Sequence, residues 1–114
     1  MLFRSVIDPA RWIAPYLEVA AAEALKIVAV TETHIHADFM SGLRELAAAT
    51  GATMYVSGCG TPDWQYGFRT DPGVTLLADR DLIRLGNVTI QAVHTPGHTP
   101  EHLVFLIKIG RAHV

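Results

Sequence analysis

The stretch Thr31–Phe39, TETHIHADF, decides how this chain folds and what it can bind. It follows the apolar run IVAV, residues 27–30, which is typical of a strand buried on both faces. After that run His34, His36 and Asp38 recur at every second position. Because residues i and i+2 of an extended segment point the same way, the two histidines can converge on one point. Clustered imidazoles with a carboxylate are typical ligands of zinc and iron, so the spacing predicts a metal site.

A second histidine group lies far downstream in HTPGHTPEH, residues 94–102. Its histidines, His94, His98 and His102, flank a Pro-Gly turn between two apolar runs. Turns at strand ends are where a rigid sheet presents functional side chains. One such group has an ordinary alternative, a polar surface with a helix cap at Asp38. Two groups, each at the end of a strand, favour a single shared metal site.

The patterns around these motifs predict an α/β layered sandwich. Residues 13–25 carry apolar positions at helical spacing, with Pro15 in the first turn, and predict an amphipathic helix. A second helix is expected over residues 41–50, opened by Asp38 and ended by a glycine cap at Gly51. Residues 58–73 are rich in Gly and Pro, which predicts a loop. Further strands are expected at residues 52–58, 74–78, 81–86, 87–95 and 102–110.

Length and composition limit the classes of function. The chain has 114 residues, of which 50% are hydrophobic and 18% charged, which suits one small globular domain. A formal net charge of −2 without a Lys/Arg cluster argues against nucleic acid and anionic membranes as partners. A single cysteine, Cys59, excludes an internal disulfide and suits a reducing cytoplasm. Without an identifiable base nearby, its thiol is expected to be inert.

The two histidine motifs, THIHAD and HTPGHT, resemble those of the metallo-β-lactamase superfamily. The similarity is closer to the bacterial persulfide dioxygenases that are often fused to rhodanese domains. It extends through VIDP, VTETHIHADFMSGLRELAAATGA, PDWQY and LGNVTIQAVHTPGHTPEHLVFL, and covers residues 6–107. The resemblance implies a partial αββα sandwich, with mixed sheets flanked by helices.

Roles for individual residues follow from the resemblance. His34 and His98 would be iron ligands, and His36 would line the same site, as a ligand in the wider superfamily. Asp38 would be a candidate catalytic residue beside the ion without binding it directly. His94 is expected to hold the turn. His102 has no role in the family pattern, so a polar residue at a strand start is expected.

Phe39 separates two activities within the superfamily. In the two-metal hydrolases a histidine stands at this position and binds the second metal, whereas a phenyl ring has no lone pair to donate. The sequence therefore favours one Fe(2+), with Zn(2+) as the alternative. The implied reaction is oxidation of a persulfide, such as glutathione persulfide, by O₂ to sulfite and thiol. The alternatives are a glyoxalase II-type thioester hydrolase with two metals and a catalytically inactive remnant.

The same resemblance predicts that residues 1–114 form a single incomplete domain, without the family's first hairpin and C-terminal half. The third iron ligand, an aspartate, would then be missing, and metal binding would be weak. Unpaired strand edges and apolar surface are also expected. The expected partners are a small-molecule thiol or persulfide and, in the full-length protein, a second copy or a fused rhodanese domain. The aromatic loop around Trp64 and Tyr66 has two interpretations: it borders the substrate cleft, or it folds back onto the sheet, which is the favoured one.

Overall fold

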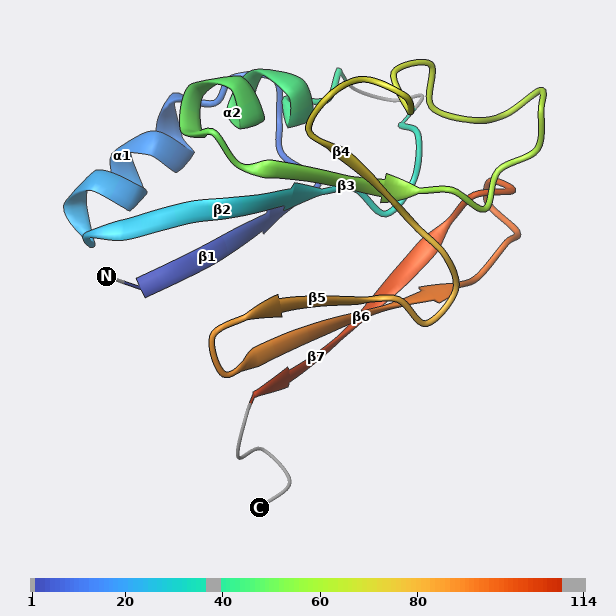
Figure 1. The fold of residues 1–114 in the computed structure, drawn as a ribbon. Coiled ribbons are helices and arrows are strands. Elements are labelled where there is room, and N and C mark those ends of the chain that lie inside the picture. The colour runs from blue at the N-terminus through green and yellow to red at the C-terminus, as the bar shows by residue number, and fades with distance from the viewer. Residues whose placement is uncertain (1, 37–39, 110–114) are drawn as a thin grey trace.

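The protein is described by a computed structural model that covers residues 2–36 and 40–109. Two helices lie on one face of a four-stranded sheet, and a three-stranded sheet lies below its other face (Figure 1). The expected α/β sandwich is therefore confirmed. In chain order the elements are β1 (Leu2–Ile7), α1 (Ala14–Ala22), β2 (Leu25–Thr31), α2 (Leu43–Thr50), β3 (Thr53–Ser57), β4 (Val74–Leu77), β5 (Leu82–Leu85), β6 (Val88–His94) and β7 (Leu103–Ile109).

The first sheet is parallel throughout and has the order β1-β2-β3-β4. The pairing of β2 with β1 shifts in register by one residue, because Arg4 pairs with Ile27 while Ser5 pairs with Ala29. The extra residue lets Ile27 and Val30 both pack toward the helices, whereas Ala29 packs toward the second sheet. Both faces of β2 are therefore buried, as its apolar run predicts.

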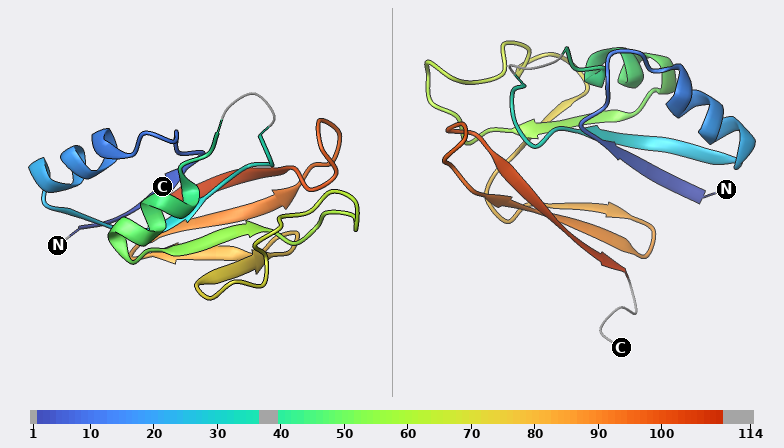
Figure 2. Two further views of the ribbon diagram at one scale, coloured as in Figure 1. Left: turned by 90° about the horizontal axis from the view of Figure 1, so that it is seen from above. Right: turned by 180° about the vertical axis from the view of Figure 1, so that it is seen from behind.

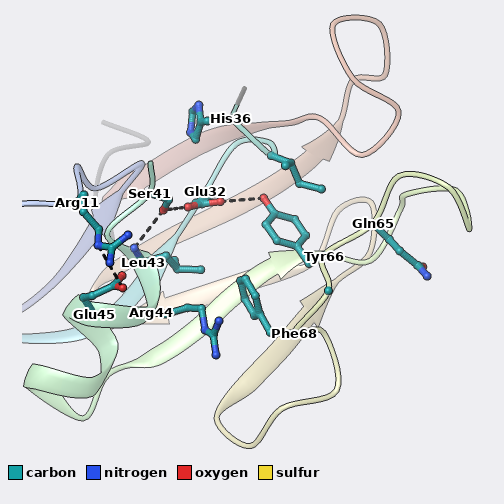
Figure 3. Close-up of a pocket in the computed structure, with 12 residues that line it drawn as sticks. Arg11, Glu32, His36, Ser41, Leu43, Arg44, Glu45, Gln65, Tyr66 and Phe68 are labelled. Carbon is teal, nitrogen blue, oxygen red and sulfur yellow. Dashed lines mark hydrogen bonds and ion pairs between the residues drawn. The ribbon is translucent and has the colours of Figure 1, made fainter. Parts of the chain in front are cut away.

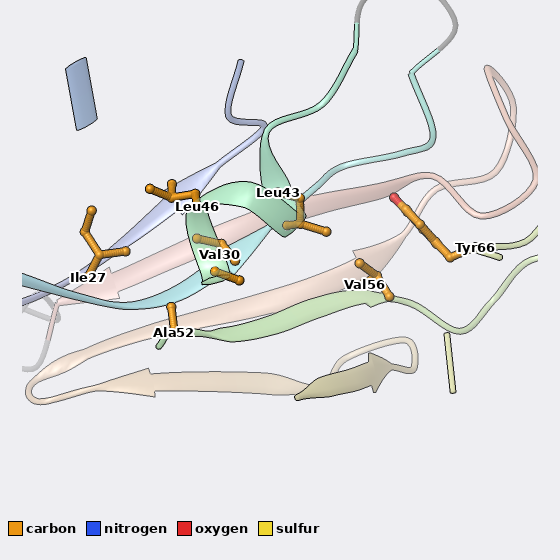
Figure 4. Close-up of a cluster of buried hydrophobic side chains, with 8 residues drawn as sticks. Ile27, Val30, Leu43, Leu46, Ala52, Val56 and Tyr66 are labelled. Atoms are coloured by element: carbon orange, nitrogen blue, oxygen red, sulfur yellow. The ribbon is translucent and has the colours of Figure 1, made fainter. Parts of the chain in front are cut away.

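The core between the helices and the first sheet is built mainly by α2. Its buried residues Leu43, Leu46 and Ala47 pack with Val30 of β2 and Val56 of β3 (Figure 4). Their spacing of three and four residues places them on one face of the helix, as expected for a helix that covers a sheet.

Helix α1 is shorter and less embedded than the sequence predicts. It begins at Ala14, with Pro15 in the first turn as expected, and ends at Ala22 because Ala24 has a φ of 54°. No residue of α1 is buried, although Tyr16 and Ala20 pack at the margin of the core. The prediction of a helix over residues 13–25 is therefore wrong in extent. The helix is also less embedded than predicted, because small alanines bury little surface. No helix within the described residues is long and apolar enough to cross a membrane.

The second sheet is antiparallel, with β6 between β5 and β7. It packs against the first sheet through a second cluster that contains Ala29, Leu77, Ile90 and Leu103. The two sheets are stacked when seen from above and from behind (Figure 2). Strand β7 lies at the edge of its sheet in the described part of the chain, and Ile107 is 60% exposed there. The exposed apolar edge that the sequence predicts is present at this strand.

Strand β1 is an element that sequence reasoning missed. Leu2–Ile7 pairs in parallel with β2, yet its first three residues are exposed and the next three only half-buried. An exposed edge strand needs neither a continuous apolar run nor strict alternation, and this segment has neither. The strand matters because it delivers Asp8 to the histidine motif.

The start of α2 also differs from the prediction. The helix begins at Leu43 with Gly42 as its N-cap and no side-chain cap, so Asp38 does not open it. Instead the Ser41 hydroxyl accepts a hydrogen bond from the Leu43 N–H at 3.1 Å. Asp38 and its neighbour Phe39 lie outside the described residues. At the other end Gly51, with a φ of 74°, provides the expected glycine cap.

Replacing Gly42 by alanine is expected to destabilise the fold by at least about 2 kcal/mol. A Cβ there would lie 2.0 Å from the backbone oxygen of Ala10, and that backbone cannot yield as a flexible side chain would. Urea unfolding followed by circular dichroism measures the change. Gly51→Ala is the matched control: its Cβ meets nothing within 4 Å, so only the positive φ penalises it, by about 1 kcal/mol. Equal losses for the two variants would contradict this account of Gly42.

Candidate functional site

Four histidine rings from the two motifs gather just beyond the end of β2. The His34 ring centroid lies 4.2 Å from that of His36, 4.8 Å from that of His98 and 4.8 Å from that of His102. We call these four residues the histidine cluster. The predicted ligands His34, His36 and His98 are therefore brought together, although the motifs are far apart in the sequence.

His102 is the member of the cluster for which the sequence predicted no ligand role. Its ring stacks on that of His34 with an interplanar angle of 25°, and its Nδ1 lies 3.2 Å from the Thr95 hydroxyl. The expectation of a polar residue at a strand start was therefore incomplete. The residue does precede β7, but the pairing of β6 with β7 turns it toward the other histidines.

His94 holds the turn between the motif's strands, as expected. Its ring Nε2 donates to the carbonyl of Pro100 at 2.8 Å, and its backbone N–H donates to the Asp79 carboxylate at 2.8 Å. The first bond lies within the second motif, and the second connects that motif to the turn between β4 and β5. His94 thus shapes the loop that carries His98.

Asp8, at the end of β1, connects the first motif to the sheet. One carboxylate oxygen accepts from the Thr33 backbone N–H at 2.8 Å and from His36 Nε2 at 2.9 Å, and the other accepts from the Thr33 hydroxyl at 2.9 Å. Because that hydroxyl proton is given to Asp8, the 2.8 Å contact between Thr33 Oγ1 and His34 Nδ1 requires Nδ1 to carry the proton. The lone pair of His34 is then on Nε2.

The protonation state of His34 suits ligation. Burial, followed by the neighbouring His36, His102 and His98, lowers the pKa of His34 below its ordinary value. A lowered pKa favours the neutral imidazole, the form that binds metal.

The residues of the histidine cluster suit a metal ion in donor type. Neutral imidazoles suit iron and zinc, and a carboxylate that orients a ligating histidine is typical of such sites. Within residues 2–36 and 40–109, however, no three His, Cys, Asp or Glu side chains are arranged so that they would hold one ion. Asp38 lies outside the described residues, so the structure does not place it.

A cavity of about 320 Å³ opens beside His36 (Figure 3). Its walls come from the first motif, the first turn of α2 and the aromatic loop after β3: Arg11, Glu32, Ile35, His36, Ser41, Leu43, Arg44, Glu45, Gln65, Tyr66, Gly67 and Phe68. Tyr66, 5% exposed, belongs both to this wall and to the core, whereas Trp64 is 40% exposed. The expectation that the aromatic loop folds onto the sheet is thus confirmed for Tyr66 and not for Trp64.

Glu32 is a buried carboxylate at the base of this cavity. It accepts hydrogen bonds from the hydroxyls of Ser41 and, at 3.2 Å, Tyr66. Burial raises the pKa of Glu32 to about 7, and the Tyr66 bond only partly opposes this. Burial and the Glu32 carboxylate in turn raise the pKa of Tyr66, so its phenol stays protonated.

Glu32→Gln is expected to remove part of the pH dependence of stability. The pKa of Glu32 is higher in the folded state than its value of 4.5 as a free group, so its contribution is fully present below pH 4.5 and is lost as pH rises through about 7. In metal-free protein the two forms should be equally stable at low pH, and the variant more stable by about 2 kcal/mol well above neutrality. Urea unfolding across this range measures the difference. Parallel pH profiles would contradict the assignment.

Sequence reasoning missed Asp8, Glu32 and Glu101 as parts of this region. Asp8 stands in VIDP, and the strand before it was not recognised. Glu32 and Glu101 stand inside the quoted motifs, but nothing in a sequence pattern shows that both are at most 3% exposed. For Glu101 the available signal was an acidic residue directly beside a motif histidine, His102.

Comparison with known proteins agrees with this geometry. A family model described as "Metallo-beta-lactamase superfamily" matches residues 5–112. The chain is 34% identical over 102 residues to a hydroxyacylglutathione hydrolase of Tolumonas auensis, covering 88% of this chain and 37% of that protein.

Two solved structures share the fold. A metallo-beta-lactamase from Staphylococcus aureus subsp. aureus COL superposes with a TM-score of 0.88 at 39% identity, over 94% of this chain and 32% of that one. ETHE1 from Myxococcus xanthus gives a TM-score of 0.76 at 27% identity, over 92% of this chain and 43% of that one. The chain thus spans less than half the length of each of these proteins.

Proposed function

This chain belongs to the metallo-beta-lactamase superfamily, and from that membership we propose that it carries the metal-binding region of a mononuclear iron persulfide dioxygenase. The reaction would convert a low-molecular-weight persulfide, such as glutathione persulfide, with O₂ and one water molecule to sulfite, thiol and two protons. The observation that carries the proposal is the histidine cluster, in which both motifs meet at the end of β2.

Within this proposal His34, His36 and His98 hold the ion. Iron(II), when bound, supplies the redox chemistry by which O₂ and the persulfide sulfur react. The Asp8–Thr33 pair keeps the proton of His34 on Nδ1 and leaves Nε2 free as a donor. The cavity beside His36 would orient the substrate on its apolar and aromatic walls and limit the access of water.

The proposal of iron rather than two zinc ions rests on Phe39. This side chain stands where the two-metal hydrolases have a histidine, so the second metal would lack a ligand. The position lies outside the described residues, and the support comes from the sequence alone.

Elemental analysis of protein purified anaerobically tests the proposal. About one iron per chain, with O₂ consumption that depends on added persulfide, is the expected result. About two zinc ions per chain would overturn the iron assignment. Absence of bound metal would overturn the metal site itself and would favour an inactive remnant.

A second candidate is a two-metal thioester hydrolase of the glyoxalase II type. It is favoured by the 34% identity to a protein named hydroxyacylglutathione hydrolase. Hydrolysis of a glutathione thioester by zinc-loaded protein, without persulfide-dependent O₂ consumption, would select this function over the dioxygenase.

A further inference from the structure

We propose that Glu101 is a positioning residue that holds the first histidine motif against the second and thereby presents ligands from both to one metal ion. The inference rests on the proposed metal-dependent function and deepens it. It concerns a residue with no assigned role among the candidate ligands or in the proposed chemistry.

The contact that carries the proposal is a short hydrogen bond between the motifs. The Ile35 backbone N–H donates to Glu101 Oε2 at 2.6 Å. Ile35 stands between His34 and His36, and Glu101 stands between His98 and His102. The bond therefore joins the residue between the two histidines of the first motif to the residue directly before His102 in the second.

A backbone hydrogen bond reinforces this connection. The Leu103 N–H donates to the Thr33 carbonyl at 2.7 Å. Together with the Ile35–Glu101 bond it brackets His34 on both sides, so the ring cannot shift relative to the second motif without breaking one of them. These two bonds, which we call the motif clamp, set the distance between the groups of histidines.

The burial of Glu101 indicates that its carboxylate does more than fill space in the core. The side chain is 0% exposed, and its Oε1 has no hydrogen-bond partner among the described residues. A buried carboxylate with an unsatisfied oxygen lowers stability, and an apolar side chain of similar size would commonly pack at least as well. What the carboxylate provides, and a leucine does not, is the acceptor for the Ile35 N–H.

Metal affinity tests the proposal without relying on turnover. We expect Glu101→Leu to weaken Co(II) binding about 10–100-fold, the range typical for residues that orient metal ligands. Glu101→Gln keeps a carbonyl acceptor for Ile35 and should bind within about 3-fold of wild type, because a neutral acceptor preserves the geometry. Titration of the full chain with Co(II), followed by its visible absorption, measures the affinity of each protein.

The matched control is Asp81→Ala. Asp81 also accepts a hydrogen bond from a backbone N–H, that of Ala78 at 2.8 Å, but in a turn outside the clamp. The Asp81→Ala substitution should leave Co(II) affinity unchanged. Circular dichroism checks that each variant is folded. If Glu101→Leu does not fold, Glu101→Asp is used in its place. The shorter aspartate side chain should not reach the Ile35 N–H, so Co(II) affinity should fall in this variant too.

The outcomes separate the inference from the function on which it rests. If the wild-type chain binds Co(II) and the folded Glu101→Leu or Glu101→Asp variant binds it with the same affinity, only the role of Glu101 is overturned. Equal losses in the Gln and Leu variants would also overturn it, because the acceptor would then not be what matters. Absence of Co(II) binding by the wild-type chain would overturn both the proposed function and this inference.

Discussion

His34→Ala is expected to weaken metal binding by at least about 100-fold. Structural zinc with four protein ligands is bound with roughly 10–16 kcal/mol, so one ligand accounts for about 3 kcal/mol, which corresponds to about 100-fold in Kd. His34 is the centre of the cluster, with three other histidine rings within 4.8 Å of its own. Metal per chain after gel filtration and the Kd from Co(II) titration measure the effect.

His94→Gln is the control for this prediction. His94 belongs to the same motif, but its ring donates to the Pro100 carbonyl, and glutamine retains an N–H donor for that bond. Its metal affinity should stay within a few-fold of wild type. Unchanged binding in His34→Ala, or an equal loss in both variants, would show that the cluster does not act as the metal site.

Leu46→Ala is expected to cost about 2–5 kcal/mol of unfolding free energy. Leu46 is 0% exposed and lies in the cluster between α2 and the first sheet, beside Val30 and Leu43 (Figure 4). Removing its branched side chain leaves a cavity that the rigid sheet cannot close. Since a domain of this size is stable by only about 5–15 kcal/mol, the loss is a large share of the total. The urea midpoint, with an unchanged m-value, reports it.

Leu17→Ala provides the comparison. Leu17 lies on α1, which has no buried residue, and is itself 36% exposed. The same substitution there should cost less than about 1 kcal/mol. If the two variants lost equal stability, α2 would not be the helix that anchors the core.

Most of the helices and strands, though not β1, and the two histidine motifs could be predicted from the sequence. The run IVAV predicted a strand buried on two faces, and the stretch SGLRELAAATG predicted a helix that ends at Gly51. The two histidine motifs were visible because spacing and position at strand ends are local properties, and the resemblance to the superfamily then selected His34, His36 and His98 as predicted ligands. Such signals can be recognised in a sequence without knowledge of the fold.

Tertiary structure alone decided what surrounds those ligands. Asp8 reaches His36 because β1 runs parallel to β2, and an exposed edge strand leaves little trace in a sequence. His102 and Glu101 join the first motif because β6 and β7 pair in the second sheet and bring the motifs together. Contacts between residues that are distant along the chain depend on how strands pair and sheets stack. No local pattern encodes that arrangement, whereas the spacing of ligands along one strand is set by the extended backbone itself.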